Sequence, residues 1–343
     1  MELDAIYIWV GTSNPFNSIF IQVKKHQKLI EDTFLKKTII LHPGVDNVKK
    51  KIKRIIKKKE LLFWHYGGFD TYLLGLKKRE IIFVYHNITP AKYFWSYDPL
   101  VSIRSFMGSI QLRLINKNSE WITMSPFNLN ELKKIGIKKT KIFPNIIENK
   151  RDYNVDKTNQ ISLIFVGRIS PNKNCVRLLE EIEKTSNNLS IQVEFTIVGK
   201  VKPGCKYGAI FTEKYKELES NPYLKLKWVK EIDEKKLIQH YQKAWLYVSM
   251  SLHEGFGVPA CESIANGTPA LYLECGGQES ILLDHGKVNL SDQHMFSDYL
   301  CNIIISDSER EQLLSKQKEI VCDFFEPKVN SMLLNIFNSY IKN

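Results

Sequence analysis

The residues best suited to chemistry lie in one stretch, 253–262, which reads His-Glu-Gly-Phe-Gly-Val-Pro-Ala-Cys-Glu. The apolar run 244–250 stops just before it, so the pattern predicts a strand, a glycine loop and then a helix. Amide groups in a glycine loop and at a helix N-terminus favour a phosphate or another anion. Glu254 on the loop and Glu262 in the first helical turn flank these amides, and both can face one ligand.

Two residues bound the predicted helix. Pro259 suits its first position, where a missing amide hydrogen costs little, and Gly267 suits the left-handed position after its last turn. The two glutamates also have a simpler interpretation. Glu262 could complement the helix dipole, which contributes about 0.3 to 1 kcal/mol, and Glu254 could be an ordinary loop carboxylate.

The complete string resembles one family, because Glu-x7-Glu contains Gly-Phe-Gly-x-Pro and is followed by Glu-x4-Gly-x-Pro. That family is the retaining, nucleotide-sugar-dependent glycosyltransferases of the GT-B fold, called family 4 or group 1. The resemblance implies that Glu254 contacts hydroxyls of the donor sugar and that Glu262 holds the ribose hydroxyls. It also implies that the backbone between them contacts the sugar and diphosphate, through Gly255, Phe256, Gly257 and Val258.

A second motif follows the strand predicted for 161–166, where the sequence reads Gly-Arg-Ile-Ser-Pro-Asn-Lys-Asn from Gly167 onward. Gly-Arg followed by Lys-Asn resembles another signature of the family. The resemblance implies that Arg168 and Lys173 clamp the donor diphosphate, Arg168 through its planar fork and Lys173 as a compact charge. A surface salt bridge is the alternative for Arg168.

The nucleobase is expected beside the turn after the strand predicted for 224–229. The resemblance implies that backbone groups of Val229 and Lys230 hold the base. Backbone contacts carry no signature of base identity, so the donor is expected to be a UDP- or GDP-sugar, with uracil and guanine both open.

The first half of the chain offers a histidine. Ligands of parallel sheets bind where strands end, and Gly11, His65 and His86 each close or follow a predicted strand. His86 resembles the family histidine that reaches the donor sugar, although a lone histidine at a strand end is otherwise usually a satisfied hydrogen-bonding residue. Many members carry paired glycines in the first loop, whereas this chain has a threonine after Gly11.

The elements that must position these residues alternate between short apolar runs and segments of helical period, which predicts a parallel α/β fold. In the first half, strands are expected at 5–10, 38–41, 61–65, 81–85, 121–124 and 141–144. The helical segment 95–118 carries Phe106, Ile110, Leu114 and Ile115, which are expected to pack in a core; contact with a lipid acceptor is the alternative.

A length of 343 residues suits two domains of ordinary size. The resemblance implies the GT-B arrangement of two Rossmann-like domains facing across a cleft. We expect residues 1–150 to form the acceptor-side domain and residues 151–325 the nucleotide-sugar domain, with a linker at 148–160. The last helix, 326–343, is expected to cross back to the first domain.

The net charge of +12 is divided unevenly. Residues 1–150 hold 26 Lys and Arg against 12 Asp and Glu, a net of +14, which leaves −2 for the remainder. The densest run extends from Lys49 to Lys59, and its three isoleucines share one helical face. It is either an ordinary solvated helix or a peripheral contact with anionic lipid. Nucleic acid is not an expected partner, because no aromatic residues are interleaved with the run.

The remaining composition narrows the class of protein. The six cysteines lack Cys-x-x-Cys spacing and all follow residue 170, so we expect neither disulfides nor a zinc site. No apolar run is long enough to span a membrane, and the N-terminus lacks the basic start of a signal peptide. We therefore expect a cytoplasmic protein, peripheral at the cytoplasmic face of the inner membrane.

The expected reaction is transfer of a hexose from a nucleoside-diphosphate sugar to a glycan acceptor, lipid-linked and part of surface polysaccharide synthesis such as O-antigen or capsule. The departing diphosphate needs cationic partners, which Arg168, Lys173 and the helix N-terminus supply. No Asp-x-Asp follows an apolar strand, so we expect no metal and no cofactor. Two alternatives stay open, a GT-B epimerase or phosphorylase and a non-catalytic sugar-nucleotide-binding subunit.

Overall fold

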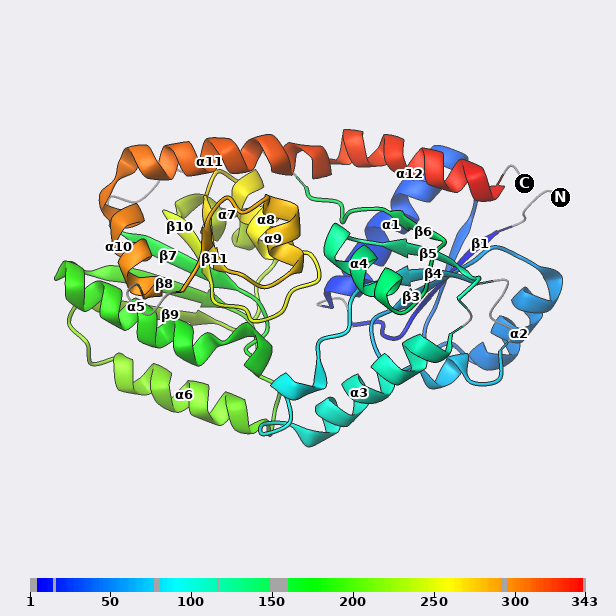
Figure 1. The fold of residues 1–343 in the computed structure, drawn as a ribbon, viewed down its shortest axis with the longest axis horizontal. Coiled ribbons are helices and arrows are strands. Elements are labelled where there is room, and N and C mark those ends of the chain that lie inside the picture. The colour runs from blue at the N-terminus through cyan, green and yellow to red at the C-terminus, as the bar shows by residue number, and fades with distance from the viewer. Residues whose placement is uncertain are drawn as a thin grey trace. The chain divides into compact units, whose positions relative to one another are not determined.

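The chain forms two compact units. Unit 1 comprises Met1–Ala91, Ile103–Ile146 and Glu326–Asn343, and unit 2 comprises Lys92–Ser102 and Ile147–Phe325. The computed structural model describes residues 5–14, 17–76, 81–115, 117–148, 160–290 and 295–341. The predicted linker therefore lies mostly outside the described residues. Strands alternate with helices along each unit, as Figure 1 shows.

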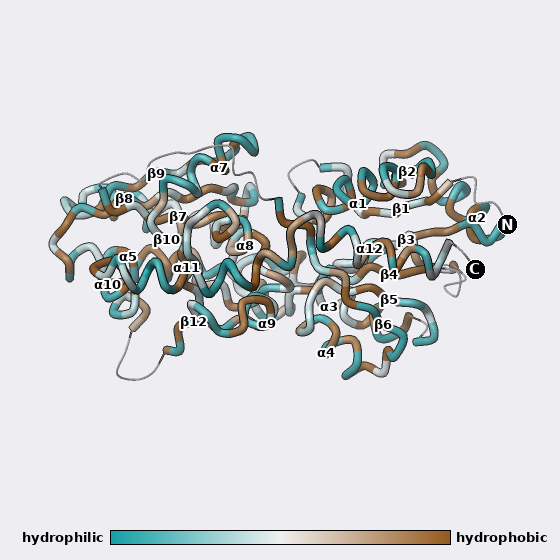
Figure 2. The backbone as a smooth tube through the Cα atoms, turned by 90° about the horizontal axis from the view of Figure 1, so that it is seen from above, coloured by the Kyte–Doolittle hydropathy of each residue, from teal (hydrophilic) through white to brown (hydrophobic). Residues whose placement is uncertain are grey.

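Unit 1 is built on a six-stranded parallel sheet with the order β2-β1-β3-β4-β5-β6. Its strands are β1 (Ile6–Val10), β2 (Thr38–Leu41), β3 (Leu62–Tyr66), β4 (Ile81–Tyr85), β5 (Glu120–Thr123) and β6 (Thr140–Ile142). All six predicted strands are present, with ends that differ by at most two residues. The central strands β3 and β4 are buried on both faces, as expected for a parallel sheet. β4, which reads IIFVY, is largely hydrophobic in Figure 2.

Helices cover both faces of this sheet. They are α1 (Ser18–Phe34), α2 (Val48–Lys58), α3 (Pro99–Leu114), α4 (Pro126–Lys134) and α12 (Glu326–Ile341), with short 3-10 turns at Thr71–Leu73 and Ala91–Tyr93. Strand residues alternate between the faces: Trp9 and Trp64 pack with α2, α3 and α4, whereas Ile8 and Phe63 face α1 and α12. The side-chain period of two in a strand explains this alternation.

Unit 2 repeats the plan with a six-stranded parallel sheet of order β12-β11-β10-β7-β8-β9. Its strands are β7 (Ser162–Val166), β8 (Val193–Val198), β9 (Leu224–Val229), β10 (Leu246–Ser249), β11 (Ala270–Leu273) and the two-residue β12 (Lys287–Val288). The sequence patterns predicted strands at 161–166, 193–198, 224–229 and 244–250, which are β7 to β10, but they did not predict β11 or β12. A two-residue strand lies below the length at which a periodic pattern becomes detectable.

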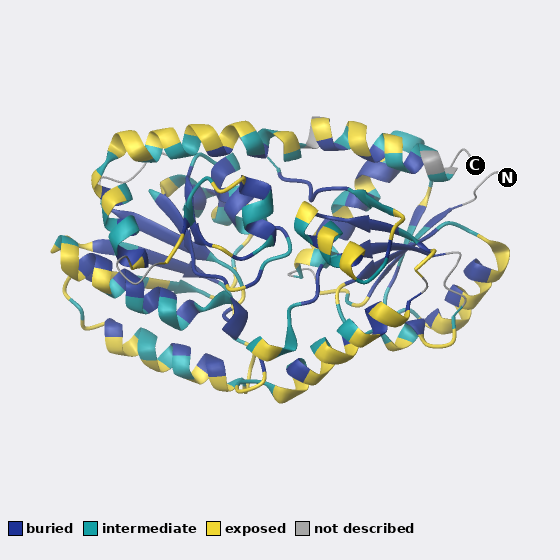
Figure 3. Ribbon diagram, in the orientation of Figure 1, coloured by how far each residue is buried: buried dark blue, intermediate teal, exposed yellow. Residues whose placement is uncertain are grey.

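The helices of unit 2 form two layers. One layer packs against the main core of the sheet and contains α5 (Cys175–Leu189), α6 (Lys206–Leu218) and α10 (Phe296–Ile305). The remaining helices are α7 (Glu234–Lys243), α8 (Val258–Ala265), α9 (Gly277–Leu282) and α11 (Asp307–Val321), with 3-10 turns at Pro171–Lys173 and Cys322–Phe324. The central strands of both sheets are buried in Figure 3, whereas the edge strands β6 and β9 are less buried and the outer helix faces are exposed.

A segment from the first half of the chain belongs to unit 2. Residues 92–102 fall within the range expected for the first domain, yet Tyr97 stacks edge-on against Tyr207 with ring centroids 5.2 Å apart. Asp98 forms an ion pair with Lys202. The Tyr93 hydroxyl donates a 3.0 Å hydrogen bond to the carbonyl of Leu252. Tertiary contacts of this kind are not visible in local sequence patterns.

Two further observations concern the expectations about cysteines and membranes. All six cysteines are free thiols. Among the described residues, no helix combines the length and apolar character needed to cross a bilayer.

Candidate active site

The two sequence motifs of unit 2 meet at one point of the sheet. β7 lies between β10 and β8 in the sheet. On one side of this point the strands follow in the order β7, β8, β9, and on the other side in the order β10, β11, β12. Ligands of parallel α/β sheets bind at the carboxyl ends of strands where the order reverses in this way. The loop after β7 and the loop after β10 both leave the sheet at this switch point, and they carry the motifs 167–174 and 253–262.

Lys173 and Glu254 form an ion pair between these loops. The Lys173 Nζ donates to Glu254 Oε1, and their side chains are only 14% and 12% exposed. The loops are also joined through their backbones, because the Leu252 amide donates a 2.8 Å hydrogen bond to the Asn172 carbonyl. Burial from water strengthens such a pair, but separating the charges without another partner would be costly.

A third loop supports Glu254 from the other side. The Glu254 amide donates to the Cys275 carbonyl at 3.1 Å, and the Gly277 amide donates to the Glu254 carbonyl at 2.9 Å. A Cβ atom at Gly277 would lie 2.3 Å from the Glu254 carbonyl oxygen, so only glycine permits this approach. The backbone of Glu254 is therefore held on both its amide and its carbonyl side.

Helix α8 follows the glycine loop as predicted. Gly257 is its N-cap, and Pro259 is the second helical residue instead of the first. The one-residue difference is small, because the amides of the whole first turn lack helical partners. Gly267 has the left-handed conformation predicted for the helix end, with φ of 88°.

Glu262 lies one turn into α8 and has a partner that sequence reasoning missed. The buried Tyr241 hydroxyl, from α7, donates to Glu262 Oε2 at 3.3 Å. Burial, followed by the neighbouring Glu262 carboxylate, raises the pKa of Tyr241 well above its usual range. Tyr241 therefore stays a neutral donor that orients the carboxylate. The two residues are 21 positions apart on different helices, so no local pattern could have paired them.

Arg168 is placed differently from Lys173. Its side chain is exposed, and its carbonyl accepts a 3.4 Å hydrogen bond from Ser170. The preceding Gly167 donates its amide to the Val198 carbonyl at 3.0 Å, which extends the pairing of β7 and β8 by one residue. The loop thus begins at Gly167, and the guanidinium of Arg168 is accessible to a ligand.

The region predicted to hold the base lies at the end of β9. The Val229 carbonyl accepts the Gly199 amide at 2.9 Å, and Trp228 Nε1 donates to the Gly199 carbonyl at 2.8 Å. The exposed Lys230 places its Nζ 5.2 Å from the centroid of the Trp228 ring. The end of β9 is therefore joined to Gly199 by two hydrogen bonds, and the Val229 carbonyl already has one protein partner.

His253 begins the ten-residue string and is buried beside Glu254. Burial, opposed by the Glu254 carboxylate, lowers the pKa of His253 to about 4. Its ring centroid lies 6.2 Å from that of Tyr93, which comes from the segment that joins unit 2. His253 is therefore neutral at pH 7, and Tyr93 is another neighbour that the sequence did not indicate.

In unit 1, two of the three residues predicted at strand ends meet. His65 Nδ1 and His86 Nε2 are 2.7 Å apart, and their rings stack with centroids 4.9 Å apart. Burial lowers the pKa of His86 to about 3. Gly11 is exposed, and a Cβ atom placed on it would meet no other atom within 4 Å, so it does not join this pair.

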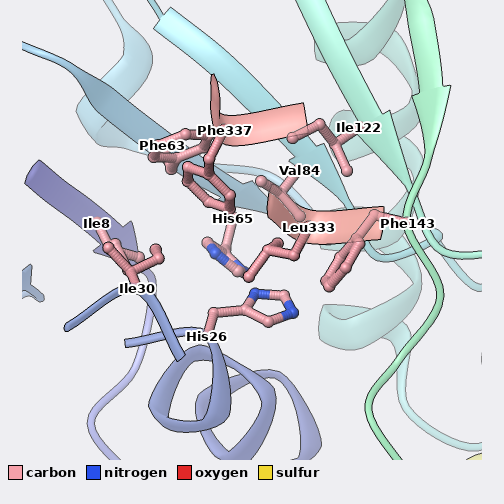
Figure 4. Close-up of a pocket in the computed structure, with 10 residues that line it drawn as sticks. All are labelled: Ile8, His26, Ile30, Phe63, His65, Val84, Ile122, Phe143, Leu333 and Phe337. Carbon is pink, nitrogen blue, oxygen red and sulfur yellow. The ribbon is translucent and has the colours of Figure 1, made fainter. Parts of the chain in front are cut away.

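Behind the pair lies His26 of α1, which together with His65 lines a small, mainly apolar pocket (Figure 4). The pocket is lined by Ile8, His26, Ile30, Phe63, His65, Val84, Ile122, Phe143, Leu333 and Phe337. Burial lowers the pKa of His26 to about 4, and the His26 Nε2 has no hydrogen-bond partner among the described residues. The three histidines are neutral at pH 7, and Figure 4 shows the rings of His26 and His65 close together.

The described residues contain no group of three or more His, Cys, Asp or Glu side chains arranged to hold a metal ion. Metal independence stays a prediction, to be decided by assay.

A family model described as glycosyl transferases group 1 matches residues 146–319, which is more than half of the chain. The chain belongs to this family, and the family prediction made from the two motifs is confirmed at that level. The assignment to family 4 and the roles given to Glu254 and Glu262 stay predictions.

A protein of the Sulfolobus islandicus filamentous virus that carries a glycosyltransferase name is 22% identical over 130 residues. The match covers 33% of this chain and 42% of the viral protein. The chain therefore spans about two fifths of the length of this curated relative.

Solved structures resemble the whole chain. Sucrose-phosphate synthase from Thermosynechococcus elongatus aligns with a TM-score of 0.77 at 16% identity, over 99% of both chains. The Anabaena protein Alr3699/HepE, solved in complex with UDP and glucose, aligns with a TM-score of 0.67 at 14% identity, over 97% of this chain and 99% of that one. At these identities the likeness establishes the fold, and the predicted α/β fold of the GT-B type is confirmed.

Proposed function

We propose that this chain transfers a hexose from a nucleoside-diphosphate sugar to a glycan acceptor, with retention of the anomeric configuration and without a metal ion. The observation that carries the proposal is the ion pair of Lys173 and Glu254 at the switch point of the unit 2 sheet. It brings a cation suited to a diphosphate next to a carboxylate suited to sugar hydroxyls. Family membership supports the same reaction class.

In this proposal each residue of the site has a separate task. Arg168 and Lys173 neutralise the charge that develops on the departing diphosphate, and the N-terminus of α8 adds its partial positive charge. Glu254, held by Cys275 and Gly277, accepts hydrogen bonds from the donor sugar. When donor binds, the Lys173 ammonium can contact a phosphate oxygen while staying near Glu254, so neither buried charge is left without a partner.

Retention is attributed to front-face displacement, in which the acceptor hydroxyl attacks the anomeric carbon from the side that the diphosphate leaves. A donor phosphate oxygen then takes the acceptor proton. This route needs no side-chain base. His86 has its pKa lowered to about 3, so in this scheme it contacts the sugar as a neutral hydrogen-bonding group.

The donor is tested with a thermal-shift series of UDP, GDP, ADP and CMP. A ligand at about 100 times its dissociation constant adds about 2.7 kcal/mol to the stability of the native state. We expect UDP or GDP to give the largest shift, and the UDP in the Anabaena structure favours UDP. Turnover with the matching sugar donors and an NMR assignment of the product anomer then test transfer and retention. No nucleotide shift, or an inverted product, would overturn the proposal.

Two alternative functions predict different products. An epimerase or phosphorylase would convert the donor or a glycan without a second sugar acceptor, and a binding subunit would give the nucleotide shift with no turnover. Transfer that requires an acceptor distinguishes the proposed reaction from both.

We further propose a lipid-linked acceptor of surface polysaccharide synthesis and a contact between α2 and anionic lipid. Ile52, Ile55 and Ile56 are buried as predicted, which leaves the lysines of α2 on its outer face. Liposome pelleting at low and high salt, with charge reversal of Lys50, Lys51, Lys57 and Lys58, tests the contact. It should weaken as the Debye length falls from about 10 Å at 0.1 M to about 3 Å at 1 M salt. Equal pelleting by neutral and anionic liposomes would contradict it.

A further inference from the structure

Helix α3 presents large apolar side chains to solvent. We define its apolar face by five residues of unit 1 and their exposed fractions: Ile103 46%, Phe106 59%, Met107 38%, Ile110 42% and Leu114 73%. Their spacing of three and four residues places them on one side of the helix. Phe106, Ile110 and Leu114 were expected to pack in a core, and this expectation is wrong. Only Ile115, just beyond the helix, is buried as expected.

The opposite side of α3 is buried but largely small or polar. Gly108 packs so closely that a Cβ atom there would lie 2.7 Å from the Phe69 amide nitrogen. Gln111 exchanges hydrogen bonds with the Asp70 backbone, accepting the amide at 2.9 Å and donating to the carbonyl at 2.8 Å. The buried Tyr66 hydroxyl donates to the Gly108 carbonyl at 2.8 Å. Apart from the buried Leu112, the usual arrangement of an amphipathic helix is therefore inverted.

These contacts determine which face points outward. Rotating α3 to bury its apolar face would break the paired hydrogen bonds of Gln111. It would also leave the buried polar groups of Asp70 and Tyr66 without hydrogen-bond partners. Leaving a continuous apolar stripe in water forgoes the burial that usually stabilises a helix. Specific contacts on the opposite side of α3 thus keep its apolar face exposed. An apolar face that is held outward in this way indicates a surface that binds an apolar partner.

The charges around the stripe identify the kind of partner. The sequence of α3, PLVSIRSFMGSIQLRL, contains no acidic residue. Its only charged side chains are those of Arg104 and Arg113. Both are exposed and lie beside the apolar face. The exposed Lys117 follows the helix. Apolar side chains beside basic ones, on a helix of 16 residues, match the interfacial zone of a membrane with anionic headgroups.

We propose that the apolar face of α3 inserts into the interfacial region of an anionic lipid bilayer, parallel to its surface. The arginines then contact headgroup phosphates while the five apolar side chains enter the acyl boundary. This deepens the proposed membrane contact and rests on it, but it assigns the apolar part of the binding to α3 instead of the lysines of α2. A second copy of the chain, or a protein partner, is the competing occupant.

The test compares two sets of exposed apolar residues. One variant carries Phe106→Ser, Ile110→Ser and Leu114→Ser. Its matched control carries Ile191→Ser, Leu283→Ser and Ile305→Ser, whose residues are 51%, 63% and 69% exposed elsewhere on the chain. Both are measured by flotation with vesicles of equal parts phosphatidylcholine and phosphatidylglycerol. We expect the α3 variant to lose at least about tenfold in partition coefficient and the control to match the wild type.

Two further measurements keep the outcome decisive. Sedimentation velocity reports oligomeric state, and the nucleotide thermal shift reports the fold and the donor site, which neither variant should change. Equal vesicle binding by both variants would overturn the inference, as would a dimer that the α3 variant dissociates without a change in lipid binding. Leu114→Glu against Ile305→Glu repeats the comparison with single changes. If the α3 variant lost vesicle binding but kept its turnover on soluble acceptors, the proposed reaction would still hold.

Discussion

Lys173 and Glu254 are 81 positions apart in the sequence and form an ion pair between the loops after β7 and β10. The pair sits where the strand order of the unit 2 sheet reverses. Both side chains are mostly removed from water, so the charge of each is compensated by the other until a ligand supplies new partners. The predictions about donor binding follow from this dependence.

The first prediction concerns the diphosphate clamp. Arg168→Ala and Lys173→Ala should each weaken binding of the nucleoside diphosphate by about 1.5 to 3 kcal/mol, because a charge-assisted hydrogen bond is lost. Binding of the nucleoside alone should change much less. Calorimetric titration of both ligands measures the difference, with the exposed α6 residue Lys216 changed to Ala as a control. Equal losses for both ligands would refute the clamp.

Lys173→Ala also removes the partner of a mostly buried carboxylate. We therefore expect this variant, but not Arg168→Ala, to lower the melting temperature. The double variant Lys173→Ala with Glu254→Gln should recover part of the loss, because an uncharged amide tolerates the missing ammonium. Thermal unfolding without nucleotide measures this coupling. Additive effects of the two changes would contradict the buried pair.

The second prediction separates the two glutamates. Glu262→Gln should chiefly raise the dissociation constant of the donor, because ribose hydroxyls are held equally in the ground and transition states. Tyr241→Phe should do the same more weakly, by about 0.5 to 1.5 kcal/mol, because it removes the hydrogen bond that orients Glu262. Steady-state kinetics and donor titration measure both.

Glu254→Gln should instead chiefly lower turnover. Its carboxylate is predicted to contact the reacting sugar, where interactions strengthen as the glycosidic bond breaks. Donor affinity should change less than the rate does. If Glu254→Gln altered only affinity, the assignment of Glu254 to the reacting sugar would be wrong.

The third prediction concerns metal. Activity should survive EDTA, because Arg168, Lys173 and the N-terminus of α8 are expected to supply the positive charge that a divalent ion would otherwise provide. Initial rates with chelator, and with added Mg²⁺ or Mn²⁺, test this. Rescue of a chelated enzyme by either ion would show that a metal takes part.

The fourth prediction concerns pH and the histidines of unit 1. Burial lowers the pKa of His26 from 6.5 to about 4, so between these values the unfolded chain binds a proton that the native chain does not. Stability therefore falls as pH drops from 6.5 toward 4, by up to about 1.4 kcal/mol per pH unit for each such histidine. Above 6.5 this contribution is complete and no longer changes.

Melting temperatures from pH 7 to 4.5 measure the slope. His26→Leu should flatten it, because leucine does not titrate and the residue faces an apolar pocket (Figure 4). His285→Gln is the control, since His285 accepts its hydrogen bond from Gln317 through the backbone carbonyl, which the change leaves in place. An unchanged slope in His26→Leu would mean that other groups cause the acid sensitivity.

Local patterns in the sequence were enough to predict most of the elements and the family. Apolar runs predicted the six strands of the unit 1 sheet and β7 to β10 of unit 2, because a buried parallel strand is apolar on both faces. Pro259 and Gly267 predicted the bounds of α8 within one residue, since their backbone preferences are intrinsic. The isoleucines of α2 were predicted to share one helical face because helical spacing alone determines which residues lie together, and the structure shows that this face is buried.

Only the tertiary structure decided which residues meet and which face solvent. The order of the strands brings Lys173 close to Glu254. That order depends on the packing of whole elements, so the sequence of neither motif indicates it. The contact of Tyr241 with Glu262 joins two helices in the same way. Helix α3 shows the limit most clearly: its apolar residues predicted burial, but hydrogen bonds of Gln111 and the close approach of Gly108 turn its polar side inward. Periodicity identifies two faces of a helix, and long-range contacts decide which one is buried.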